Sequence, residues 1–155
     1  MIEDGSKAPN FALPDDTGEK VQLSKLKGRP VVVYFYPKDD TSGCTREAKD
    51  FTCLADDFAA AGAELIGISP DSPATHRKFK SKHELSIRLL ADEQKEAANA
   101  YGVWVEKSMY GRKYMGIERS TFLIDKGGKL VKSWRKVKVP GHAEEVLAAL
   151  RALKT

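Results

Sequence analysis

Residues 31–50 read VVVYFYPKDDTSGCTREAKD, and most of the architecture can be predicted outward from this strand-to-helix transition. The apolar run from Val31 to Tyr36 is uninterrupted, which is typical of a central strand covered on both faces. A proline ends the run and a short polar loop follows. The segment after Cys44 is rich in helix-forming residues. We therefore expect a thiol at the beginning of a helix, directly after a buried strand.

The expected position of Cys44 favours its thiolate form. The first turn of a helix has unpaired N–H groups and carries roughly half a positive charge, and both stabilise an anion. Thiolate is the nucleophilic form of cysteine. A lone cysteine is more often an inert packed side chain, so the local sequence is what points to a reactive one.

Hydrophobic spacing predicts the remaining elements. Expected helices cover residues 45–61, 73–83, 93–101 and 143–153. Expected strands cover residues 64–69, 120–124 and 129–134, with a hairpin turn at 125–128. Two short strands, 11–14 and 21–23, form an N-terminal hairpin. The order predicts an α/β fold in which a central mixed sheet is flanked by helices on both sides.

Length and charge narrow the class of protein. A chain of 155 residues suits a single domain, residues 1–155, with one core. Charges of both signs are interspersed, with a net charge of +4. The densest basic stretch, residues 132–138, alternates with apolar residues. That alternation is more typical of a half-solvated strand than of a nucleic-acid surface.

No apolar run approaches the ~20 residues that span a bilayer, so no membrane partner is expected. The acidic start, residues 1–5, lacks the apolar segment of a signal peptide, which favours a cytoplasmic location. His76 and His83 lie seven residues apart on one face of an expected helix, but two imidazoles alone make a poor metal site, and we expect them to be solvated. With no nucleotide or calcium motif either, we expect no cofactor and no metal.

The spacing Pro37-x-x-x-Thr41-x-x-Cys44, with Glu47 three residues further on, resembles the active-site signature of peroxiredoxins. Residues 116–125, GIERSTFLID, are similar to the strand that supplies the arginine of this family, here Arg119. The resemblance runs from residues 5–11 to residues 136–142. It is closest to the bacterioferritin comigratory protein, or peroxiredoxin Q, subgroup. That subgroup has a proline where this chain has a serine, at position 42, so a less restrained loop is expected.

The resemblance implies a thioredoxin-like fold and a thiol peroxidase that reduces hydrogen peroxide and organic hydroperoxides through a sulfenic acid on Cys44. It further implies that Arg119 stabilises the thiolate, Thr41 orients the peroxide, Pro37 shields the sulfur and Glu47 positions the arginine. Each residue alone also has a structural explanation, such as a helix N-cap for the threonine or a surface ion pair for the arginine.

The second cysteine, Cys53, lies nine residues after Cys44 on the same expected helix. Nine residues rise about 13 Å and turn to the opposite face. A disulfide needs Cα atoms within roughly 7 Å, so the two thiols cannot pair while the helix is intact. Relatives often place a resolving cysteine five residues after the first, here Lys49, or on the next helix, here around Lys80. We expect Cys53 to be a buried structural residue; a resolving role, after unwinding or between chains, stays open.

A peroxide-responsive redox sensor would use the same activated thiol and remains the alternative function. The absence of Cys-x-x-Cys argues against a disulfide reductase. The expected partners are a hydroperoxide and a thiol reductant such as thioredoxin, and the resemblance favours a monomer over a dimer. Residues 109–115 read as a mobile loop that would wall the pocket, dock the reductant or simply pack.

Overall fold

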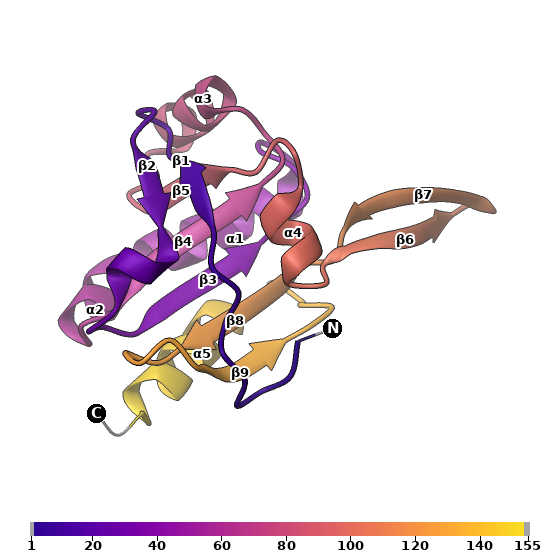
Figure 1. Ribbon diagram of the computed structural model, residues 1–155. Helices are drawn as coiled ribbons and strands as arrows, with labels where there is room; N and C mark the ends of the chain where they lie inside the picture. The colour runs from indigo at the N-terminus through magenta and orange to yellow at the C-terminus, as the bar shows by residue number, and fades with distance from the viewer. Residues whose placement is uncertain (1, 154–155) are drawn as a thin grey trace.

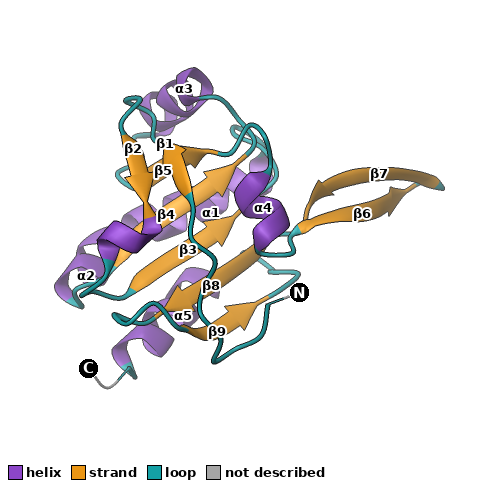
Figure 2. Cartoon of the chain, viewed as in Figure 1, coloured by secondary structure: helices purple, strands orange, loops and turns teal. Residues whose placement is uncertain are grey.

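The computed structural model describes residues 2–153 and places a five-stranded sheet at the centre (Figures 1 and 2). The strand order is β5-β4-β3-β8-β9. Parallel pairs join β3 (Val31–Phe35) to β4 (Glu64–Ser69) and β4 to β5 (Arg88–Ala91). Antiparallel pairs join β3 to β8 (Ser120–Ile124) and β8 to β9 (Leu130–Trp134). The mixed sheet expected from the sequence is confirmed.

The central strand β3 divides the apolar residues into two cores. Val31, Val33 and Phe35 pack on one face, against the N-terminal hairpin and α4 (Glu96–Ala100). Val32 and Tyr34 pack on the other face. That second face is covered by α1 (Ser42–Cys53), α2 (Ala55–Ala60), α3 (Pro73–His83) and α5 (His142–Arg151). Helices lie on both faces of the sheet, as Figure 2 shows.

A close approach between β3 and β4 sets the position of α1. The ring of Tyr34 lies over Gly67 of β4, where an added Cβ would be 2.7 Å from the Tyr34 Cζ atom. Only glycine fits at that distance. The Tyr34 ring also stacks on Phe51 of α1, with ring centroids 4.6 Å apart. The stack holds α1 against the sheet.

The N-terminal segment crosses the sheet and touches both of its edges (Figure 1). The expected hairpin is present as β1 (Ala12–Pro14) and β2 (Lys20–Gln22), followed by a 3-10 helix, η1 (Leu23–Leu26). Asp15 forms a bridge with Leu90 on edge strand β5. At the other edge, Lys7 pairs with Lys129, just before β9. We call residues 5–15 the N-terminal strap.

Two helices differ from the sequence prediction. The expected helix 45–61 begins earlier, at Ser42, and is broken at Leu54, which has φ −101° and ψ 6°. Its apolar spacing continues through the break, so the pattern gave no sign of it. The expected helix 93–101 is shorter because Lys95 has φ 57°, outside the helical region. Strand β5, only four residues long, was not predicted.

The expected loop 109–115 is instead part of a hairpin of β6 (Trp104–Met109) and β7 (Arg112–Ile117). Tyr110 and Gly111 form its two-residue turn, both with positive φ, as such hairpins favour. The hairpin projects from the body in Figure 1. Charged residues interrupt its apolar alternation, which hid the strands. Among residues 2–153, no helix is both long and apolar enough to cross a membrane.

Candidate active site

Cys44 lies in the first turn of α1, directly beyond the C-terminal end of β3. Thr41 is the N-cap residue, with extended backbone angles of φ −96° and ψ 156°. Its carbonyl accepts the N–H of Thr45 at 2.8 Å. The Cys44 side chain is buried, with 2% of the residue exposed. The fold thus places the thiol where the unpaired N–H groups of a helix N-terminus favour an anion.

Arg119 joins Cys44 to Glu47 through one guanidinium group. Its Nη2 donates to Cys44 Sγ at 3.3 Å, and its Nη1 donates to Glu47 Oε1 at 2.6 Å. Arg119 comes from the short connection between β7 and β8, whereas the other two residues come from α1. Because both ends of the planar fork are occupied, its orientation at the sulfur is fixed.

Burial and mutual proximity both shift the pKa values of Glu47 and Arg119. Burial raises the pKa of Glu47 to about 7, even though the neighbouring Arg119 guanidinium acts in the opposite direction. For Arg119, burial disfavours the cation, but Glu47 and Cys44 outweigh it and raise the pKa of the guanidinium. Arg119 therefore stays a cation beside the sulfur at any physiological pH.

Gly43 makes the close approach of Arg119 possible. A Cβ added at this position would lie 3.3 Å from Arg119 Nη2, tighter than an ordinary contact. Gly43 was not among the residues predicted from the sequence. Its position next to Cys44 was the signal available in the sequence. That signal was not enough, because the role of Gly43 depends on Arg119, which is distant in the sequence.

Thr41 and Pro37 lie on the loop that leads into α1. The Thr41 hydroxyl donates to the Lys38 carbonyl at 2.8 Å, and the residue is exposed. Pro37 is half-buried and directly follows Tyr36. The structure thus brings Cys44, Glu47 and Arg119 into direct contact and places the other two predicted residues on the adjoining loop.

An open depression of about 330 Å³ lies next to Arg119, lined also by Lys107, Glu118 and Lys136. Burial, together with the Arg119 charge, lowers the pKa of Lys107. Lys107 was not predicted to lie near Arg119, because the hairpin that carries it was not expected. A smaller hollow of about 120 Å³ beside Ile124 lies at the opposite end of the sheet and is separate from this site.

Three residues differ from their predicted surroundings. Cys53 is the last residue of α1 and is exposed rather than buried, because it points away from the core that Cys44 faces. His76 is fully buried rather than solvated. It contacts Asp39 of the loop before α1, and this partner, 37 residues away in sequence, makes its burial tolerable. His83 is largely covered and contacts Asp40.

Comparisons with known proteins agree with this arrangement. The AhpC/TSA family matches residues 5–133. Peroxiredoxin Bcp of Bacillus subtilis is 54% identical over 150 residues, 97% of this chain and 96% of that protein. The PrxQ structure of Xylella fastidiosa gives a TM-score of 0.93 at 38% identity and covers 98% of this chain and 97% of that one. The bacterioferritin comigratory protein of Xanthomonas campestris, studied for its alkyl peroxide reduction activity, gives 0.88 at 44% identity over 92% and 90%.

The chain belongs to the AhpC/TSA family. Its fold is the thioredoxin-like fold of the peroxiredoxins. Within that class it is of the Bcp and PrxQ type, a thiol-dependent peroxidase that acts through a cysteine. The family, the subgroup and the fold expected from the sequence are confirmed.

Proposed function

We propose that Cys44 is the cysteine that attacks the peroxide, and that the substrates are hydrogen peroxide and small organic hydroperoxides. The observation that supports this most directly is the 3.3 Å contact between Arg119 Nη2 and Cys44 Sγ at the start of α1. A fixed cation and a helix N-terminus both favour the thiolate. Cys53, at the exposed end of the same helix, has neither.

In the proposed reaction, the Cys44 thiolate attacks one oxygen of the hydroperoxide. An S–O bond forms, the O–O bond breaks, and its electron pair leaves with the other oxygen. That oxygen takes a proton to become water or an alcohol, and Cys44 becomes a sulfenic acid. The Arg119 guanidinium stabilises the charge that develops on the leaving oxygen, in the manner of a preorganised donor.

The neighbouring residues complete the proposed site. The Thr41 hydroxyl can donate and accept, so it can orient the peroxide once it exchanges its bond to the Lys38 carbonyl. Pro37 has no N–H and shields the sulfur. Glu47 fixes the fork of Arg119 through the 2.6 Å contact.

We propose that thioredoxin or another external thiol returns the sulfenic acid to the thiol, and that the chain works as a single-domain monomer in the cytoplasm. Both cysteines are free thiols, which suits a reducing compartment. Among residues 2–153, the large exposed apolar side chains lie mostly on the β6–β7 hairpin, and little else suggests a dimer surface.

Replacement of the cysteines tests the assignment. Cys44→Ser should abolish peroxide consumption with dithiothreitol as reductant, because serine is not ionised at neutral pH, whereas the matched Cys53→Ser variant should keep turning over. Peroxide is followed colorimetrically, and circular dichroism checks the fold. Activity above about a tenth of wild type in Cys44→Ser would exclude Cys44. Wild-type protein that consumes one equivalent of peroxide and then stops would favour the alternative function, a peroxide-responsive redox sensor.

A further inference from the structure

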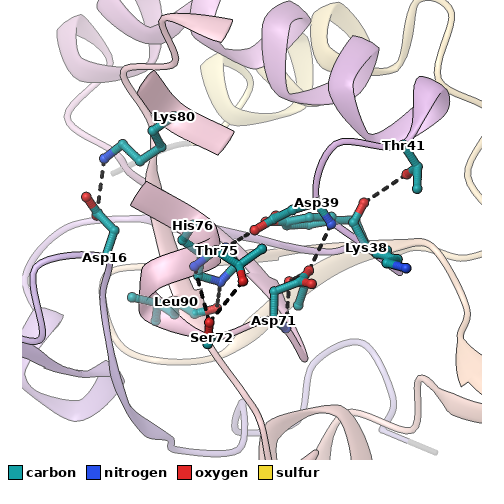
Figure 3. A network of polar contacts seen from close by, with 12 residues as sticks. Asp16, Lys38, Asp39, Thr41, Asp71, Ser72, Thr75, His76, Lys80 and Leu90 are labelled. Atoms are coloured by element: carbon teal, nitrogen blue, oxygen red, sulfur yellow. Dashed lines mark hydrogen bonds and ion pairs between the residues drawn. The ribbon is translucent and has the colours of Figure 1, made fainter. Parts of the chain in front are cut away.

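A buried polar cluster outside the site holds the loop between β3 and α1 (Figure 3). At its centre is Asp39, which is 5% exposed. The Tyr36 hydroxyl donates to Asp39 Oδ1 at 2.6 Å. On the other side, His76 Nδ1 lies 2.6 Å from Asp39 Oδ2. His76 comes from α3, which the proposed reaction does not otherwise involve.

The partners of His76 determine where its protons lie. Its Nε2 is 2.9 Å from the Leu90 carbonyl oxygen, which can only accept, so Nε2 carries a hydrogen. The short contact between Nδ1 and the Asp39 carboxyl then also requires a proton between them, on either atom. His76 is therefore held at both ends of its ring. It binds Asp39 with a buried hydrogen bond that water does not weaken.

The backbone of Asp39 is held as well. Its N–H donates to Asp71 Oδ2 at 2.8 Å, and the same oxygen accepts the Ser69 hydroxyl at 2.7 Å. Ser69 is the last residue of β4, and Asp71 lies in the loop after it. Contacts from α3 and from the loop after β4 thus converge on one residue of the loop that precedes Cys44.

From Asp39 the restraint passes to the site through the next few residues. The carbonyl of its neighbour Lys38 accepts the Thr41 hydroxyl at 2.8 Å. The Thr41 carbonyl accepts the first N–H of the α1 ladder, from Thr45. Ser42 stands where the subgroup has a proline, so the loop lacks that ring's restraint on φ. The contacts of Asp39 supply a restraint from another element.

We propose that His76 is a positioning residue for the peroxide reaction: by holding Asp39, it fixes the turn that places Thr41 beside Cys44. The inference rests on the roles of Cys44 and Thr41 under the proposed function. His76 does not touch the substrate. Its effect is on the geometry in which peroxide meets the sulfur, where small displacements are costly to rate.

Two amide variants separate the two ends of the ring. In His76→Asn the amide nitrogen lies near the position of Nδ1 and keeps a donor to Asp39. In His76→Gln it lies near the position of Nε2 and keeps only the donor to the Leu90 carbonyl. We expect His76→Gln to slow oxidation of Cys44 by hydrogen peroxide about tenfold, and His76→Asn to stay within about threefold of wild type. Rapid-quench mass spectrometry of the sulfenic acid measures these rates.

The rate at which iodoacetamide alkylates Cys44 distinguishes a positioning role from a merely structural one. A merely structural role would change the peroxide and alkylation rates together. Alkylation needs the thiolate but not Thr41, so its rate should match wild type in both variants. Lys82→Ala is the matched control: Lys82 lies on the same helix and contacts the adjacent loop residue Asp40 at the surface, 2.8 Å away. It should oxidise at the wild-type rate.

A folded His76→Gln variant that oxidises at the wild-type rate would overturn the inference, as would equal losses in the peroxide and iodoacetamide rates. If His76→Gln does not fold, Asp39→Ala decides, because it removes the carboxyl that His76 holds: slower oxidation supports the inference and a wild-type rate contradicts it. A wild-type Cys44 that fails to react with peroxide would instead contradict the proposed function itself.

Discussion

Around the sulfur of Cys44, one guanidinium serves two acceptors. Arg119 gives one nitrogen to the sulfur and another to the Glu47 carboxyl. A lysine ammonium has no planar fork and could not keep both contacts in the same geometry. Under the proposed function the carboxyl acts by orienting Arg119, since its own charge is disfavoured by burial.

At Gly43 we expect stability and activity to separate. In Gly43→Ala the new methyl group presses on Arg119 Nη2, which should move the guanidinium off the sulfur and slow oxidation of Cys44 on the order of tenfold. Alanine favours a helix over glycine by roughly 1 kcal/mol, so the variant should not unfold more easily. Stopped-flow rates and urea unfolding measure the two effects. A wild-type oxidation rate would show that the guanidinium tolerates the methyl group.

At this scale the sequence predicted the residues that carry the motif and missed those that depend on distant partners. Cys44, Glu47 and Arg119 lie in recognisable local patterns, and the structure brings them into contact. His76 was expected at the surface because its partner Asp39 lies on another element. A lone histidine in a helix gives no sign of a buried carboxylate supplied by a loop.

Among the elements, α1 bears most directly on how the oxidised cysteine is resolved. Cys44 lies in its first turn and faces the core, whereas Cys53 is its last residue and is exposed. The helix ends there because Leu54 leaves helical geometry. The break lies beyond both thiols, so it does not bring them nearer.

We therefore expect no intramolecular Cys44–Cys53 disulfide after one equivalent of peroxide. A bridge would require about two helical turns to unwind and the Phe51 stack on Tyr34 to open. Intact mass should show a gain of one oxygen on Cys44, and peptide mapping should find Cys53 reduced. A stoichiometric bridge within one chain would show that α1 opens locally during turnover.

Elements with strong local signals were predicted well. The buried run of β3 and the glycine-containing turn between β8 and β9 are examples. The weak signals failed: β5 has four residues, and the β6–β7 hairpin carries charged and apolar residues on the same strands. The hairpin forms through the pairing of β6 with β7 and has no continuous apolar face that a sequence pattern would show.

For the whole molecule, Glu47 makes stability depend on pH. Burial raises the pKa of Glu47 to about 7 from an ordinary value of 4.5. Between these values the folded chain holds a proton that the unfolded chain has lost, so stability falls as the pH rises. The loss from this group approaches about 3 kcal/mol, at about 1.4 kcal/mol per pKa unit.

Glu47→Gln removes this titration while keeping an acceptor for Arg119. Relative to wild type, the free energy of unfolding of the variant should therefore rise between pH 4.5 and pH 7.5, by up to about 3 kcal/mol. Urea unfolding at both pH values measures the difference, and all other titrating groups cancel in the comparison. Parallel pH profiles for the two proteins would rule out a buried, protonated Glu47.

The alternation of strands and helices was enough to predict a mixed sheet, but not the course of the chain across it. The path of the N-terminal strap depends on isolated contacts, such as those of Asp15 and Lys7, that leave no periodic pattern. Such contacts follow from the assembled sheet and cannot be inferred from the segment alone.

The strap also bears on how the enzyme behaves in a crowded solution. An open sheet has two rows of unpaired backbone groups that can recruit a strand from another molecule. Here one segment reaches both: Asp15 bridges to Leu90 on β5, while Gly5 and Ser6 exchange backbone hydrogen bonds with Leu130 on β9. Because residues 5–15 occupy part of each edge, we expect them to protect the folded peroxidase against edge-to-edge aggregation.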